Sequence, residues 1–263
     1  MFHDPEVLAR LTNWLFAHRQ IRTRIPKGLR FKDGEKDLVM EIEHLNSDHV
    51  AYLTDYFSFS GFSLQIFSWT EYPGIPTGGQ IWCIVRSGDN PPPWISQKEA
   101  RLRFGLRGDS SRDANVWAFT LYLHYLHLAY TKLDRHPQEI SRYVDVVFTE
   151  EALVQIVREF VNKLAEEHAN KTTAVSILTN ESGQEIERRV SNFLGFLDST
   201  GCISFNKNDK AYSQTLLGAA DVAEHYSREI TYLVPRPEIN SEALKEILVE
   251  DEPEDDNEPD QEN

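Results

Sequence analysis

Cysteine is scarce in this chain of 263 residues, which contains only Cys83 and Cys202. The two lie far apart and form no CxxC pair, which argues against a disulfide framework and against a zinc site built on paired thiolates. We expect two buried thiols in a reducing compartment. Long apolar runs are missing too, because no stretch approaches the roughly 20 residues of a membrane helix and the N-terminus does not resemble a signal peptide. The sequence therefore predicts a cytoplasmic protein that does not enter a membrane.

The common motifs of nucleotide and hydrolase chemistry are also missing. The chain has no GxxxxGK[ST] phosphate loop, no GxGxxG after a strand and no GxSxG nucleophile turn. His124 and His127 stand three apart in a helical pattern, but no carboxylate or thiolate motif accompanies them, so helix packing is favoured over a metal site. We predict no enzyme activity, no cofactor and no metal; an enzyme with an unfamiliar site is the third hypothesis.

Cations are outnumbered, with 27 Lys and Arg against 42 Asp and Glu, which gives a formal net charge of −15. Much of the excess lies in residues 250–263, which hold nine carboxylates and no cation. A segment so charged and so poor in apolar groups cannot offset the entropy of ordering, so we expect residues 236–263 to be a disordered tail. The tail either solvates the protein or imitates nucleic acid and competes for a basic surface on this protein or a partner.

Length and a hydrophobic content of 40% predict two folded domains. In the first, residues 1–90, a helix begins at Pro5, and a break near Asn46 separates two further helices. Residues 62–71 and 79–87 are rich in aromatic and β-branched side chains and flank a turn-rich stretch, which predicts a β-hairpin.

Residues 91–115 are polar and predict mainly a long connection, with some helix around residues 95–104. The second domain, residues 116–235, contains an apolar helix, an amphipathic helix that begins at Thr149, and a helix, a hairpin and a last helix from residue 185 onward. The order of helices followed by a hairpin thus occurs twice. It predicts an α+β, mainly helical fold of tandem winged-helix domains with small β-hairpin wings. The connection carries a basic set: Lys98, Arg101, Arg103, Arg107 and Arg112.

The helix and hairpin of residues 185–215 hold the candidate DNA-binding residues. An apolar stripe from Ile186 to Leu197 defines the core face of the helix, and Gly201 predicts its end. In winged helices that read DNA, exposed basic and polar side chains of the helix and the wing contact bases and phosphates. Neighbouring carboxylates dilute the charge here, so a weak phosphate-contacting surface and a merely solvated surface fit equally well. The candidates are Arg188, Arg189, Asn192, Lys207 and Lys210.

Several stretches resemble MukE, the small accessory subunit of a bacterial SMC condensin. "EIERRVSNFLGFLDSTGCISFNKNDKAYSQTLLGAADVA" is similar to its second winged helix, and "FTEEALVQIVREFV" to the helix before it. "GFSLQIFSWTE…GQIWCIVRSGDNPP" resembles the wing hairpin of its first domain, and the acidic C-terminal tail is similar as well. The order of these elements resembles the kleisin-interacting tandem winged-helix (KITE) family, which includes MukE, MksE and the small subunit of the Wadjet plasmid-defence condensin.

The resemblance implies a subunit that dimerises, binds a MukF/MksF-like kleisin, lies near a MukB/MksB-like SMC ATPase and contacts the double-stranded DNA backbone. It implies a cytoplasmic, nucleoid-associated protein that supports chromosome organisation and segregation or defence against plasmids. The long connection departs from MukE, so the resemblance does not decide between a housekeeping condensin and a plasmid-defence condensin. The alternative is a winged-helix transcriptional regulator, for which Arg188 and Arg189 would be needed to bind a specific duplex site.

Overall fold

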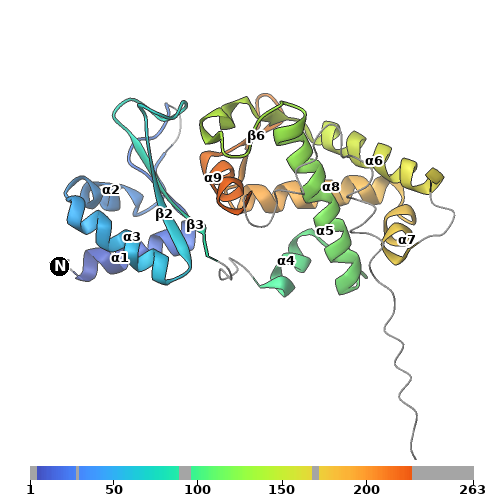
Figure 1. Cartoon of the computed structure of the whole chain (residues 1–263), viewed down its shortest axis with the longest axis horizontal. Coiled ribbons are helices and arrows are strands. Elements are labelled where there is room, and N and C mark those ends of the chain that lie inside the picture. Colours follow the sequence, from blue (N-terminus) through green and yellow to red (C-terminus); the bar gives the residue numbers. More distant parts are fainter. Residues whose placement is uncertain (1–4, 28–29, 89–95, 168–171, 227–263) are drawn as a thin grey trace, which may run out of the picture.

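The computed structural model describes residues 5–27, 30–88, 96–167 and 172–226 (Figure 1). Helices dominate, and the strands form two small antiparallel sheets, which confirms the predicted α+β, mainly helical class. The predicted tail at residues 236–263 lies outside the described residues. Within the described ranges, the helices are too short or too polar to cross a bilayer.

The first half of the chain combines three helices with a sheet of strand order β1-β3-β2. Asn46 separates the second and third helices, because its side chain accepts a hydrogen bond from the backbone N–H of His49 at 3.0 Å in a capping box. The predicted break at this position is confirmed. The elements are α1 (Pro5–His18), β1 (Gln20–Arg22), α2 (Glu35–Glu43), α3 (Ser47–Phe59), β2 (Phe62–Ser68) and β3 (Gln80–Arg86).

The second half is a group of helices with a second sheet, of strand order β4-β6-β5. Thr149 caps the longest helix by accepting a hydrogen bond from Ala152 N at 3.2 Å, and Gly201, at φ 77°, follows α8 as predicted. The elements are α4 (Gln97–Phe104), α5 (Ser111–Leu126), a π-helical turn η1 (His127–Thr131), a 3₁₀ helix η2 (Ile140–Asp145), β4 (Val147–Phe148), α6 (Glu150–Glu167), α7 (Thr173–Thr179), α8 (Gly183–Ser199), β5 (Ile203–Asn206), β6 (Ala211–Gln214) and α9 (Leu216–His225).

Within the predicted connection over residues 91–115, the helix expected around residues 95–104 is confirmed, but the next helix begins earlier than predicted. Residues 97–104 form the complete helix α4, and α5 begins at Ser111 after a capping box between Ser110 and Asp113. α4 contacts α5 and α8, so this basic segment belongs to the second half. The sequence predicted the helix of α4 but not its place in the second half, because most of its positions are polar and do not indicate what it packs against.

Each half has its own apolar core. In the first half, α1, α2 and α3 cover one face of the sheet, and the core includes Leu11, Leu53, Phe57 and Trp82. In the second half, the core lies among α5, α6 and α8 and includes Trp117, Leu121, Leu153, Val157, Val190 and Phe193. Each half thus buries apolar surface of its own.

A third apolar cluster joins the halves. All five side chains of residues 81–85 in β3 are buried, and because successive side chains of a strand point to opposite faces, this run indicates a strand covered on both sides. Trp82 and Ile84 belong to the core of the first half, whereas the odd-numbered side chains pack against α9. Figure 1 shows α9 lying beside this sheet.

Polar contacts reinforce this junction. Arg19, at the start of β1, donates to Asp221 of α9 at 2.9 Å, and Ser87, just after β3, donates to Glu224 at 2.6 Å. The hydroxyl of Tyr143 in η2 donates to the carbonyl of Pro73, in the turn between β2 and β3, at 2.6 Å. The β2–β3 hairpin is therefore held against the second half along its length and does not project into solvent as a separate wing.

Candidate nucleic-acid interface

The predicted binding residues of α8 and its hairpin occupy different environments. Arg188 is exposed on α8, Asn192 is half-buried one turn later, and Lys207 and Lys210 are exposed in the turn between β5 and β6. Hydrogen bonds at the start of α6, together with the nearby charge of Lys210, lower the pKa of Glu151. Lys210 of the hairpin therefore lies near the Glu151 carboxylate of α6, which offsets part of its positive charge.

The prediction that Arg189 is exposed is wrong. Only 2% of its side chain is accessible, and its guanidinium donates to both carboxylate oxygens of Asp109, at 2.8 and 2.9 Å, and to Glu181. Its Cζ also lies 4.9 Å from the centroid of the Trp117 ring. Position 189 follows Ile186 by three residues and so lies on the core face of α8. Arg189 fixes the loop before α5 onto α8 and is not available for DNA.

The remaining exposed surface of α8 is not basic. Glu187 pairs with Arg158 of α6 at 2.5 Å, and Glu185 accepts a hydrogen bond from Ser182 N at 2.9 Å in the capping box. The corresponding helix of the first half, α3, contains two aspartates and neither lysine nor arginine. Neither helix therefore offers the cluster of cations that major-groove reading requires.

A cleft of about 400 Å³ lies between the two halves. Residues from the end of α1, from β1 and Lys32 before α2 line one side, and Arg103 of α4 and the turn after α8 line the other. Among the described residues its walls contain four cations and one carboxylate, the opposite of the balance in the chain as a whole, although one of the cations, Arg19, is already paired with Asp221. The cations are Arg19, Arg22, Lys32 and Arg103, the carboxylate is Asp198, and His18, Ser199, Thr200 and Thr215 contribute further polar groups.

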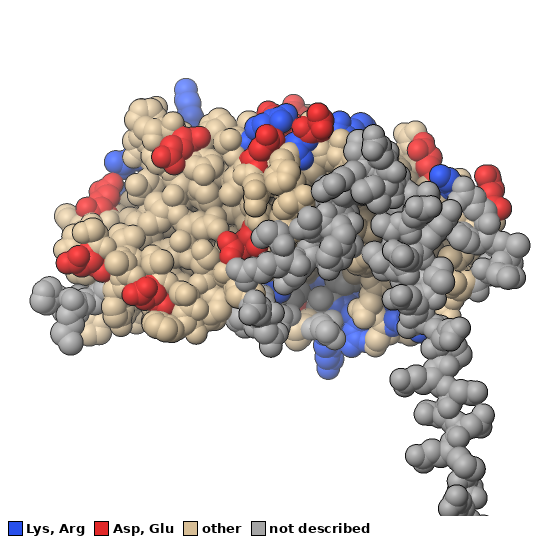
Figure 2. Space-filling view, in the orientation of Figure 1, with Lys and Arg blue, Asp and Glu red and all other residues tan. Residues whose placement is uncertain are grey.

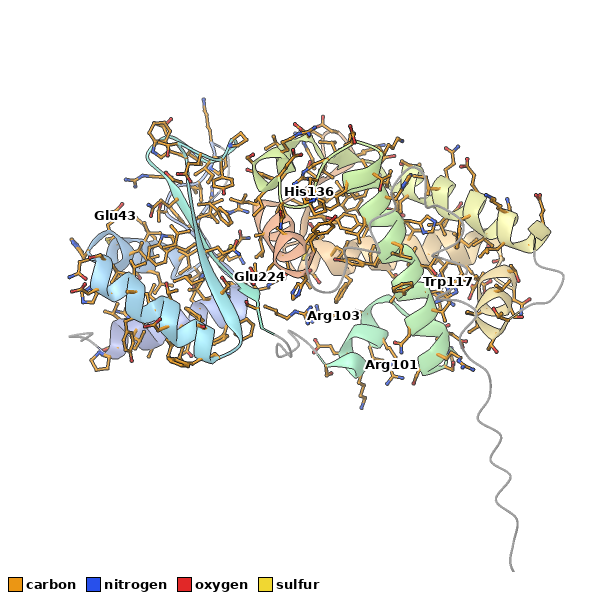
Figure 3. The ribbon with its side chains drawn as sticks, viewed as in Figure 1. Glu43, Arg101, Arg103, Trp117, His136 and Glu224 are labelled. Atoms are coloured by element: carbon orange, nitrogen blue, oxygen red, sulfur yellow. The ribbon has the colours of Figure 1, made fainter. Side chains whose placement is uncertain are left out.

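Hydrogen bonds within each half hold polar side chains that line the cleft. Arg103 donates to the Ser199 hydroxyl at 3.3 Å, and Figure 3 shows it pointing from α4 toward the first half. Lys32 Nζ lies 3.4 Å from His18 Nδ1, and burial together with the charge of Lys32 lowers the pKa of His18. The His18 ring is therefore neutral at pH 7, and its nitrogen accepts a hydrogen bond from Lys32. An anion in the cleft would meet cations from two separate chain segments.

The basic segment around α4 extends the cleft. Lys98, Arg103 and Arg107 are exposed, while Arg101 donates to Ser111 at the start of α5. Figure 2 shows Lys and Arg side chains gathered at the lower edge of the molecule, where Figure 1 places α4. Sequence reasoning singled out these cations but assigned them to a connection. The fold places Arg103 in the cleft wall with cations of the first half, and no local pattern links those segments.

His124, predicted to pack within a helix, is half-buried against α6. His124 Nδ1 lies 2.7 Å from the carbonyl oxygen of Thr120, and its ring packs 4.7 Å from that of Phe160. Burial lowers the pKa of His124, so its ring is neutral at pH 7. Across the residues that the structure describes, no group of three or more His, Cys, Asp or Glu side chains is placed to hold a metal ion. His124 serves helix packing.

The two cysteines are free thiols. Cys83 is fully buried, and burial raises its pKa to about 12. Cys202 is half-buried and accepts a long hydrogen bond from Arg19 at 3.6 Å, but burial raises its pKa as well. Both groups are protonated at neutral pH, which makes them poor nucleophiles.

Lys32 and Arg103 of the cleft and the nearby Lys98 and Arg107 are exposed and can contact a polyanion, because phosphate groups are anions that Arg and Lys recognise. Arg19 is buried and already paired with Asp221. No protein-family model, curated protein or solved structure matches the chain.

Proposed function

We propose that this protein is a non-enzymatic accessory subunit of a bacterial SMC condensin of the MukBEF, MksBEF or Wadjet kind, and that it binds a kleisin and the DNA backbone. In this role it forms a homodimer, associates with the nucleoid through the SMC complex, and supports chromosome organisation and segregation or defence against plasmids.

The observation that carries the proposal is the repeated strand order. In both halves a hairpin follows a pair of helices, and a strand from earlier in the chain joins the second hairpin strand, as β1-β3-β2 and β4-β6-β5. This order matches the one expected of a winged helix, in which helices and a small hairpin surround one core, and it supports the proposal. The chain contains two such units, which are joined through α9 and the third core. We propose that they form a tandem pair of winged-helix domains.

Charge favours a subunit of a complex over a transcriptional regulator. A regulator needs cations on the helix that enters the major groove, whereas α3 has none and Arg189 of α8 is buried against two carboxylates. The cleft and α4 supply cations suited to phosphates instead. Contacts to phosphates position a protein on DNA without reading its sequence.

Co-purification of the full-length protein from its natural host, with mass-spectrometric identification of partners, tests the proposal. We expect a kleisin and an SMC ATPase in stoichiometric amounts. A stable lone monomer with neither partner would contradict it.

Replacing three cations of the cleft should weaken DNA binding. In Arg22→Gln/Lys32→Gln/Arg103→Gln we expect at least a tenfold loss of affinity for duplex DNA of any sequence, and the slope of log K against log salt should fall by roughly 2 to 3, because each lost phosphate contact releases about one counterion fewer. Fluorescence anisotropy over a salt series measures both quantities. The matched control is Lys207→Gln/Lys210→Gln, which also removes charge but at the hairpin turn; a larger loss in the control would move the interface to the hairpin.

Deleting residues 250–263 should strengthen DNA binding at low salt, because the nine carboxylates that this segment adds to the chain repel DNA and can compete with it for the cations of the cleft. We expect the gain to disappear above roughly 0.3 M salt, where the Debye length is short. The thermal unfolding midpoint should not change. Equal affinity of the two proteins at low salt would leave the tail only a solvating role.

A further inference from the structure

The outer face of α3 carries a ridge of alternating acidic and aromatic side chains. Asp48, Tyr52, Asp55 and Phe59 follow one another at spacings of four, three and four residues, which places them on one line along the helix. The buried residues of the same helix, Leu53 and Phe57, lie on the opposite side and enter the core. We call these four residues the α3 ridge.

The α3 ridge exposes unusually large apolar groups. Phe59 is 92% exposed and Tyr52 is 46% exposed, and Tyr56 beside them is 38% exposed. Exposing a whole phenylalanine ring to water is unfavourable relative to burying it, and aromatic side chains are enriched at the centres of protein interfaces. Clustered exposed aromatic groups on one helix therefore mark a docking surface.

The charge around the aromatic groups decides what docks there. Asp48 and Asp55 alternate with them, and α3 contains no Lys or Arg. Figure 2 shows this face, over α3 at the left, with separate carboxylates on an uncharged surface and without Lys or Arg. DNA and anionic membranes would be repelled, and a symmetric contact between two copies of α3 would gather four carboxylates without a cation. A basic surface is the complement.

From this ridge we infer that α3 docks a basic amphipathic helix of another polypeptide, which sets its apolar side chains against Tyr52 and Phe59 and its Lys or Arg side chains against Asp48 and Asp55. An amphipathic helix fits because its side chains recur at the same spacings of three and four residues as those of the ridge. The inference names a surface for a protein partner, and to that extent rests on the proposed function. It also assigns α3 and the cleft to different partners, protein and DNA.

Site-specific photo-crosslinking in full-length protein tests the inference. Benzoylphenylalanine is placed at position 59 or, as a matched control, at Thr54, which is exposed on another side of α3. After irradiation in the natural host, we expect crosslinks at position 59 to peptides with a net positive charge and apolar residues at helical spacing, and at least tenfold less product at position 54. Asp48→Lys/Asp55→Lys should reduce the product at position 59 at least tenfold. Three results would overturn the inference. Position 59 could give no crosslink, it could crosslink to a second copy or to an acidic segment, or its crosslinking could be unaffected by the charge reversal.

The variant Phe59→Ser separates this inference from the proposed function. Because Phe59 is exposed, we expect an unchanged unfolding midpoint and loss of the protein partner from co-purification. If kleisin and SMC ATPase remain with Phe59→Ser, the proposed function stands and the inference falls. If neither co-purifies with the wild type but a basic segment of another protein crosslinks at position 59 in the charge-dependent way, the inference stands and the proposed function falls.

Discussion

Arg189→Ala should destabilise the protein by about 3 kcal/mol, because it leaves the carboxylates of Asp109 and Glu181 largely buried without their cation. The substitution also removes the guanidinium from the Trp117 ring, with which it stacks at 4.9 Å. Chemical denaturation followed by tryptophan fluorescence measures the change in the free energy of unfolding.

The control is the neighbouring arginine. Arg188 is exposed on the same turn of α8, so Arg188→Ala should change the free energy of unfolding by less than about 0.5 kcal/mol. The pair also bears on the regulator hypothesis, in which both arginines contact DNA. Equal, small effects of the two substitutions would show that Arg189 is not a structural cation.

The contribution of Arg189 to the free energy of unfolding should decrease as the pH falls. Burial raises the pKa of Asp109, but hydrogen bonds from Arg189 and from the Leu106 N–H outweigh it, so the pKa lies below the ordinary value of 3.8. A carboxyl with a lowered folded-state pKa contributes its full stability above the unfolded value and loses it as the pH falls through the folded one. The difference between wild type and Arg189→Ala should therefore be constant from pH 7 to about pH 5 and narrow below pH 3.8.

Gly218→Ala should destabilise the protein by about 3 kcal/mol through a steric clash at the junction of the halves. A Cβ at Gly218 would lie 2.9 Å from Cys202 Cα and nearer still to its carbonyl oxygen. α9 cannot easily retreat, because Thr215 at its start donates to the carbonyl of Gly201 at 2.6 Å and Asp221 holds Arg19 across the junction. Thermal or chemical unfolding of the purified variant measures the loss.

Gly195→Ala is the matched control, since Gly195 also lies within a helix but a Cβ there would meet no atom within 4 Å. It should stabilise the protein by roughly 0.5 to 1 kcal/mol, because alanine loses less backbone entropy than glycine in a helix. The two glycines should thus respond with opposite signs. A neutral Gly218→Ala would show that α9 shifts freely over the turn after α8.

Local chemistry in the sequence determined where most elements begin and end. Asn46, Thr149 and Gly201 act within three or four residues of their own position, so caps and stops are readable without knowledge of the fold. The apolar stripe of α8 was readable for the same reason, and all its large side chains are buried as predicted. The basic character of residues 98–112 and the helix around residues 95–104 were readable too, although not their place in the second half.

Tertiary structure alone decided what those elements face. Arg189 is separated by 80 residues from Asp109, the carboxylate that keeps it buried, so its polarity suggested exposure although its position in the helix did not. The apolar run of β3 became the junction of the two halves only because α9 returns to cover its second face. The cleft likewise joins cations near residues 19–32 to Arg103. Sequence periodicity indicates which face of a helix or strand is apolar. Contacts between distant segments decide which element covers that face and which charged side chains come together.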